Sequence, residues 1–215
     1  MIRKNKATLI LTSIVILIPV FIGLLLWNKL PDQIPTHWNI DGEADNWSSK
    51  AFAVFALPAI LLALHWICFL ASMMDPKRDA YTRKTLTLVL WICPVISLLM
   101  GSLIYTKALG YDLNVGTVMS VLVGLMFLVV GNLLPKMRQS YTMGIKLPWT
   151  LDNEENWNKT HRLGGKLWVA GGIVILATAF LGNFWILLGV LVVMVAVPTV
   201  YSYLLYRKQA KEMEK

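Results

Sequence analysis

Residues 7–27, ATLILTSIVILIPVFIGLLLW, form an apolar stretch that decides the class of this protein. The stretch carries no charge and reaches the about 20 residues with which a helix crosses about 30 Å of hydrocarbon. Arg3, Lys4 and Lys6 precede it, as in a secretory signal, but it exceeds the roughly 7–15 residues of a signal peptide's apolar region. It ends in WNKLP (27–31) without a small-x-small cleavage site. We therefore predict a retained membrane-spanning helix.

Further apolar segments of similar length follow at residues 51–74, 85–106, 115–134, about 163–182, and 184–206. Lipid offers no hydrogen-bonding partner to an exposed backbone, so each of these segments is predicted to be a helix. Composition agrees, because 57% of the residues are hydrophobic and only 15% are charged, whereas a soluble domain carries about 25% charged residues. The fold class predicted is an all-α integral membrane protein with six transmembrane helices.

The chain is expected to form one bundle in three sequential parts. Residues 1–74 form a first helical hairpin with an outside loop at 28–50, and residues 75–134 hold spans three and four. Residues 135–215 hold a longer cytoplasmic loop and spans five and six. Only residues 182–184 join these last two spans, so a re-entrant pair is the alternative at this end of the chain.

Basic residues predict the orientation, because cytoplasmic loops carry an excess of Lys and Arg. With the N-terminus inside, 17 of the 20 basic residues lie inside, and only Lys29, Lys50 and Lys107 lie outside. Every inside loop contributes to this excess, so both ends are expected in the cytoplasm. The net charge of +8 is thereby explained by topology, and no direct contact with nucleic acid is expected.

The outside loop, NKLPDQIPTHWNIDGEADNWSSK (28–50), is acidic and contains two tryptophans. One interpretation is a receptor surface for a cationic or amphipathic extracellular ligand. The other is a solvated loop that Trp38 and Trp47 anchor at the headgroup level. A calcium loop is discounted, because counting from Gly42 as the sixth position puts His37 and Ser48 where an EF-hand needs acidic ligands. His37 with Asp41 or Asp45 is a weak metal signal, and we expect neither metal nor cofactor.

The long inside loop, PKMRQSYTMGIKLPWTLDNEENWNKTHR (135–162), is predicted to contain a short helix. Thr150 or Asp152 is expected to cap it. The helix would lie along the inner membrane interface, with Trp149 and Trp157 as anchors. Two interpretations stay open: a docking surface for a cytoplasmic protein, or an elbow that orients spans four and five.

Catalysis is not expected, because the sequence contains no HExxH, GxSxG or P-loop motif. His65 is the one imidazole within a predicted span, and intramembrane ionisable groups are functional candidates by default. No acidic or basic residue lies deep in another span to pair with it. A neutral His65, hydrogen-bonded to Ser, Thr or Asn, is therefore the favoured interpretation.

Two sequence patterns resemble those of the SdpI-type family of bacterial immunity proteins. The outside pattern includes IPTHWNIDG (34–42) and the inside pattern includes GIKLPWTL (144–151) with Trp157 and THR at 160–162. The inside pattern is the more specific of the two. Where the family is expected to read Gly-Ile-Arg-Thr-Pro-Trp, this chain has Lys146 and Leu147, which keep the charge but lose a bidentate contact.

The resemblance implies a multi-pass protein of the bacterial plasma membrane that protects the cell from a secreted, membrane-active peptide toxin. It also implies a signalling role, in which the protein holds a cytoplasmic repressor at the membrane. The partners expected are thus membrane lipid, an extracellular peptide toxin and a cytoplasmic repressor. The residues expected to face the toxin are His37, Trp38, Asp41, Gly42, Asp45, Trp47 and Lys50. Those expected at a docking surface are Gly144, Lys146, Pro148, Trp149, Thr150, Trp157, His161 and Arg162.

Two alternatives remain beside immunity. The protein could act only as a signalling receptor that sequesters a repressor. It could also be a small-solute transporter, whose polar path would be formed by His65, Ser97, Ser120 and Thr178. A dry, packed helix bundle would argue against transport.

Overall fold

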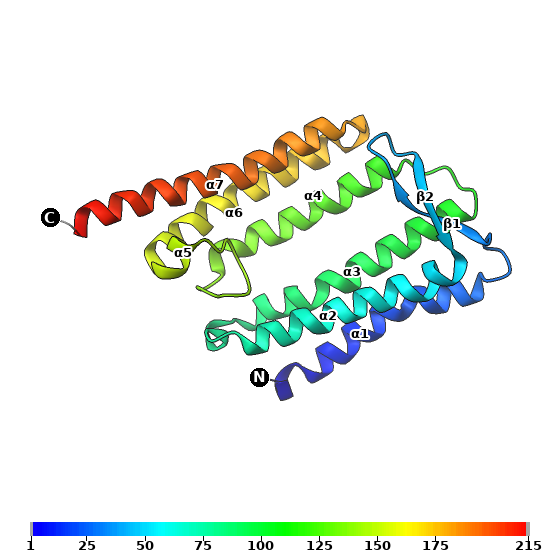
Figure 1. The fold of residues 1–215 in the computed structure, drawn as a ribbon, viewed down its shortest axis with the longest axis horizontal. Coiled ribbons are helices and arrows are strands. Elements are labelled where there is room, and N and C mark those ends of the chain that lie inside the picture. Colours follow the sequence, from blue (N-terminus) through cyan, green and yellow to red (C-terminus); the bar gives the residue numbers. More distant parts are fainter. Residues whose placement is uncertain (1, 214–215) are drawn as a thin grey trace. The chain divides into compact units, whose positions relative to one another are not determined.

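A computed structural model describes residues 2–213, which form helices and one two-stranded sheet (Figure 1). The α-helices are α1 (Ile2–Leu25), α2 (Leu57–Met74), α3 (Arg83–Ala108), α4 (Val115–Leu133), α5 (Pro148–Asp152), α6 (Glu154–Thr178) and α7 (Phe184–Met213). The sheet pairs β1 (Gln33–Trp38) with β2 (Ala44–Ser49). Short helical turns are η1 (Phe52–Ala56), η2 (Arg78–Ala80), η3 (Leu134–Lys136) and η4 (Ala179–Leu181).

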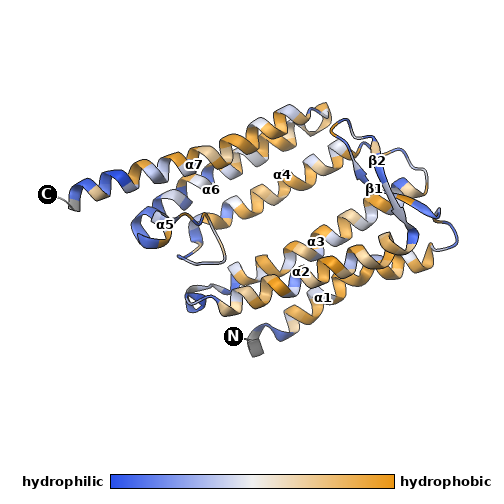
Figure 2. Ribbon diagram, viewed as in Figure 1, coloured by the Kyte–Doolittle hydropathy of each residue, from blue (hydrophilic) through white to orange (hydrophobic). Residues whose placement is uncertain are grey.

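The prediction of an all-α protein with six spans is confirmed. Within residues 2–213, six helices are long and apolar enough to cross a membrane. Hydrophobic residues cover these helices, while the tip of the sheet, α5 and the C-terminal end of α7 are hydrophilic (Figure 2). The orientation of the chain across the membrane stays a prediction.

The short helix predicted within 135–162 is present as α5, but the expectation that it also carries Trp157 as an interfacial anchor is wrong, because Trp157 lies on α6. α6 begins at Glu154, nine residues before the predicted start at 163, and continues without a break into the fifth span. Neither Thr150 nor Asp152 caps it. Instead, the Asn153 side chain accepts a hydrogen bond from the Asn156 amide at 2.9 Å, and Glu154 with Glu155 supplies negative charge to the first turn.

The chain divides into two compact units. Unit 1 comprises residues 2–71 and 83–115, and unit 2 comprises residues 72–82 and 116–213. The connection between α2 and α3 therefore belongs to unit 2, although most of both helices belongs to unit 1. Each unit has its own polar contacts and close helix packing.

Polar contacts in unit 1 join α1 to α2 and α3. The buried His65 shares a hydrogen bond of 3.0 Å with Thr12, so the prediction of a hydrogen-bonded partner for His65 is confirmed. Two hydroxyl groups of α3 donate to α1 carbonyls near Pro19: Ser97 to Ile16 at 2.8 Å and Tyr105 to Pro19 at 2.8 Å. Such bonds satisfy donors that lipid would leave unpaired.

Glycines bring α4 and α6 of unit 2 into backbone contact. Gly124 and Gly131 lie seven residues apart on α4, and Gly165 and Gly172 lie seven apart on α6, so each pair lies on one helix face. A Cβ atom at Gly172 would lie 2.8 Å from the Gly124 carbonyl oxygen, and one at Gly165 would lie 2.8 Å from that of Gly131. Small residues permit this approach in membrane helices, where van der Waals packing drives association.

Candidate functional site

The loop predicted between the first two spans is a β-hairpin in unit 1. Its strands pair antiparallel, with Pro35 opposite Trp47 and Trp38 opposite Ala44, and the register is irregular around His37. The Asn39 side chain closes the turn by accepting the amides of Asp41 at 3.0 Å and Glu43 at 2.9 Å. Gly42 has a φ of 81°, a conformation that glycine adopts without steric cost.

The hairpin exposes several of the residues predicted to face a ligand. His37 and Asp45 are exposed and form a 2.6 Å pair. Asp41 is exposed at the turn, and 51% of Trp47 is accessible. These side chains form an acidic surface with an exposed aromatic ring.

The remaining ligand-facing candidates have structural contacts. Gly42 shapes the turn, and Trp38 packs against a buried cluster that includes Ile34 and Tyr105. The ammonium group of Lys50 donates to the carbonyls of Trp27 and Leu30 at 3.3 Å, just after the end of α1. Its positive charge suits the negative end of a helix, so Lys50 fastens the hairpin to α1.

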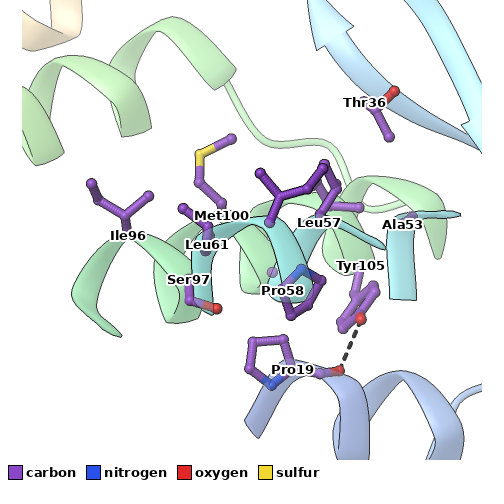
Figure 3. A pocket seen from close by; sticks show the side chains of 13 residues that line it. Pro19, Thr36, Ala53, Leu57, Pro58, Leu61, Ile96, Ser97, Met100 and Tyr105 are labelled. Carbon is purple, nitrogen blue, oxygen red and sulfur yellow. Dashed lines mark hydrogen bonds between the residues drawn. The ribbon is translucent and has the colours of Figure 1, made fainter. Parts of the chain in front are cut away.

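A cavity of about 240 Å³ lies beside this hairpin, also within unit 1 (Figure 3). Residues of α1, η1, α2 and α3 line it together with Thr36 of β1. The π-helical turn η1 ends where the Leu57 amide donates to the Phe52 carbonyl, five residues back. Single π turns are frequent at functional sites, and this one directly precedes Leu57 in the cavity wall.

The polar groups of the cavity wall already have partners. The Ser97 hydroxyl donates to Ile16, the Tyr105 hydroxyl donates to Pro19, and Thr36 shares a hydrogen bond of 2.9 Å with Ser48. The Tyr105 bond is drawn in Figure 3. The surface left to a ligand is therefore mainly hydrocarbon.

Unit 2 contains a second ordered region, the signature segment (residues 135–162), which is organised around Asp75. This carboxylate is 3% exposed. Its oxygens accept the amides of Lys77 at 2.8 Å, Tyr141 at 2.9 Å and Thr142 at 3.0 Å. It also accepts hydroxyl hydrogen bonds from Tyr81, Ser140 and Thr142. Asp75 thus ties the end of α2 to the signature segment.

The environment of Asp75 keeps it ionised. Burial by itself would raise its pKa, but the hydrogen bonds from Tyr81, the Lys77 amide, Ser140 and Thr142 outweigh burial and lower the pKa to about 2. The pKa of Tyr81 is raised, first by burial and then by its hydrogen bond to Asp75. Sequence analysis missed this pair. The available signal was an acidic residue placed directly after an apolar span.

His161 and Trp157 hold the other side of the signature segment. Trp157 is fully buried, and its ring stacks on His161 at a centroid distance of 3.9 Å. His161 Nδ1 donates to the Trp157 carbonyl at 2.8 Å, and Nε2 accepts from the Ile145 amide at 2.9 Å. These two bonds define a neutral imidazole. Gly144 packs against both rings with a φ of 105°.

The predicted docking residues thus separate into internal and external groups. Thr150, Trp157 and His161 are buried, and the expected role of Trp157 as an interfacial anchor is wrong. Lys146, Pro148 and Arg162 are exposed. Trp149 is half-buried, where its ring donates to the Ser202 hydroxyl at 2.9 Å and stacks near Tyr206.

Metal binding finds little support in the described residues. Between residues 2 and 213, no group of three or more His, Cys, Asp and Glu side chains is placed to hold an ion. The His37–Asp45 pair lacks a third ligand of this kind. Two candidate regions therefore remain: the hairpin with its cavity, and the signature segment.

Comparisons with known proteins match both regions. A family model described as the SdpI/YfhL protein family matches residues 136–202, and a model for a domain of unknown function (DUF1648) matches residues 14–62. The chain is 24% identical to the immunity protein SdpI of Bacillus subtilis (strain 168) over 213 residues, which covers 96% of this chain and 97% of the relative. No solved structure matches the chain. The chain is therefore a multi-pass protein of the bacterial plasma membrane, and its residues 136–202 are similar to the SdpI/YfhL protein family.

Proposed function

We propose that this protein is an immunity protein that protects its cell from a secreted, membrane-active peptide toxin. The observation that carries the proposal is the similarity to an immunity protein over 96% of the chain, across both candidate regions. A role without catalysis fits a chain whose buried histidines are engaged in hydrogen bonds within their own units.

In this proposal the hairpin faces outside and meets the toxin. His37, Asp41, Asp45 and Trp47 are the accessible candidates. Trp38, Gly42 and Lys50 contribute by holding the hairpin in shape. The acidic character of the surface favours cationic partners, since complementary charge steers encounter and selects partners.

The test is expression of the protein in a toxin-sensitive strain, with its presence in the membrane confirmed by blotting. Cells that produce the protein are expected to survive across a toxin titration that kills the parent strain. The matched control is the Gly172→Leu variant, which places a bulky side chain at an α4–α6 backbone contact. Equal killing with and without the intact protein would contradict immunity.

We also propose a signalling role, in which the signature segment docks a cytoplasmic repressor. Its support is the exposure of Lys146, Pro148 and Arg162 around a segment that Asp75 and His161 hold in place. Toxin treatment is expected to move a co-encoded repressor from the soluble fraction to the membrane fraction. A repressor that stays soluble with and without toxin would exclude this role and leave immunity standing.

A further inference from the structure

We propose that the cavity beside the hairpin binds an apolar side chain of a cationic, amphipathic peptide. This inference rests on the proposed immunity function and gives it a binding site. The cavity lies within unit 1, where the hairpin residue Thr36 and the helix residues Leu57 and Met100 share its wall. A peptide lying at the membrane surface would meet the hairpin and this cavity together.

The size of the cavity suits a side chain. An engineered cavity of about 150 Å³ lined by apolar groups binds benzene, and this cavity measures about 240 Å³. It therefore has room for an aromatic or branched aliphatic side chain. Its wall includes the exposed Ile60, so access does not require the unit to unfold.

The chemistry of the wall selects an apolar group. Ser97, Tyr105 and Thr36 each have a hydrogen-bonding partner within unit 1. A polar group that entered the cavity would lose its water without gaining a partner, which is costly. Hydrocarbon would gain burial at no such cost.

The charge of the hairpin selects a peptide in preference to a lipid. Asp32 and Asp45 pair with Lys50 and His37. Within the part of the chain that the structure describes, Asp41 and Glu43 form no salt bridge, and both are exposed. These carboxylates attract basic side chains and repel anionic headgroups, so they complement a ligand that carries positive charge beside its apolar groups.

Photo-crosslinking of the full-length protein in lipid nanodiscs tests the proposal. The probe is a synthetic amphipathic Leu/Lys peptide that carries one diazirine leucine. Labelling is expected at the cavity residues Leu57, Leu61 and Met100, as mapped by mass spectrometry. A phosphatidylcholine with a diazirine in its acyl chain serves as the second probe. Labelling of these residues by the lipid probe alone would overturn the proposal, as would labelling by neither probe.

Matched variants test the cavity and the charge separately. Met100→Trp fills the cavity and is expected to weaken peptide labelling by about tenfold. Leu99→Trp is its control, because Leu99 is a neighbouring exposed residue of α3 outside the cavity wall. The paired change Asp41→Asn and Glu43→Gln is expected to weaken labelling by about threefold at low salt. Its control is Asp112→Asn, an exposed acid outside the hairpin.

Equal labelling of the Met100→Trp and Leu99→Trp variants would overturn the cavity assignment. Leu61→Trp fills the cavity from α2, so it separates loss of the cavity from a folding defect specific to the Met100→Trp variant. Thermal unfolding shows whether each variant is folded. Survival of toxin-treated cells is scored separately. Protection without cavity labelling would overturn only this inference, whereas labelling without protection would overturn the proposed immunity function.

Discussion

At the residue scale, single side chains join segments that lie far apart in the chain. The carboxylate of Asp75 accepts hydrogen bonds from residues 65 to 67 positions away. The imidazole of His161 joins α6 to the irregular stretch before α5 through the Ile145 amide. Buried polar groups of this kind give specificity when every member is satisfied, and losing one member leaves the others unpaired.

Gly144→Ala is expected to destabilise unit 2 by about 2–4 kcal/mol. Its Cβ atom would lie 2.5 Å from His161 Nε2 and 2.8 Å from the Trp157 ring, in a backbone conformation that disfavours side chains. Thermal unfolding in detergent, followed by tryptophan fluorescence, measures the loss. Gly182→Ala is the control, since Gly182 has a φ of 59° and no atom within 4 Å of the added Cβ. The Gly182→Ala variant should lose only about 1–2 kcal/mol of stability, which comes from backbone strain. Equal losses of stability in the two variants would refute the predicted clash at Gly144.

Asp75→Asn is expected to lower stability by about 2 kcal/mol at neutral pH, because the pKa of Asp75 falls from 3.8 to about 2 in the folded protein. A lowered pKa means that ionised Asp75 stabilises the fold above about pH 4 and that this contribution disappears as the pH approaches 2. The difference in unfolding temperature between the wild type and the variant should therefore shrink over this interval. Asp79→Asn is the control, because Asp79 is exposed. A difference that persists unchanged at pH 2 would count against the carboxylate's role.

At the element scale, helix ends and close helix pairs depend on local chemistry. Asn153 caps the start of α6, and the helix then continues without a break from Glu154 into the fifth span. α7 continues to Met213, seven residues past the predicted end at 206, because its last turns are polar but still good helix formers. α4 and α6 touch at the backbone only because glycines face each other.

Gly172→Ala is expected to separate α4 from α6 and to cost about 1–3 kcal/mol. The added Cβ would lie 2.8 Å from the Gly124 carbonyl oxygen and 3.1 Å from the Leu128 amide nitrogen, and neither backbone can move alone. Unfolding in detergent provides the measurement. Gly189→Ala is the control, because the space around its Cβ is open and alanine favours a helix. A Gly172→Ala protein as stable as the control would show that the two helices can move apart freely.

At the scale of the whole molecule, two units share one chain whose path crosses between them. The chain leaves unit 1 at the end of α2, passes through residues 72–82 of unit 2, and returns to unit 1 in α3. Asp75 lies in this connection. The family matches follow a similar division, since residues 14–62 lie in unit 1 and residues 136–202 in unit 2.

The predicted topology places the hairpin outside and the signature segment inside. In a background with Cys68 and Cys93 replaced by serine, a cysteine at Asn46 should react with a membrane-impermeant maleimide in intact cells. A cysteine at Arg138 should react only after the cells are opened. Both positions are exposed, so accessibility alone does not separate them. The reverse pattern would invert the topology, and labelling of both in intact cells would refute six crossings with this loop order.

The amino-acid sequence by itself determined the membrane class, the six spans and their approximate bounds, because hydropathy over about 20 residues is a local property. The resemblance of the two loops also pointed to the family whose model matches residues 136–202. Only the tertiary structure decided that the outside loop is a hairpin, that Trp157 and His161 are internal, and that Asp75 organises the signature segment. These features depend on pairings between residues distant in sequence, such as Asp75 with Ser140, and no local pattern records which distant groups will meet.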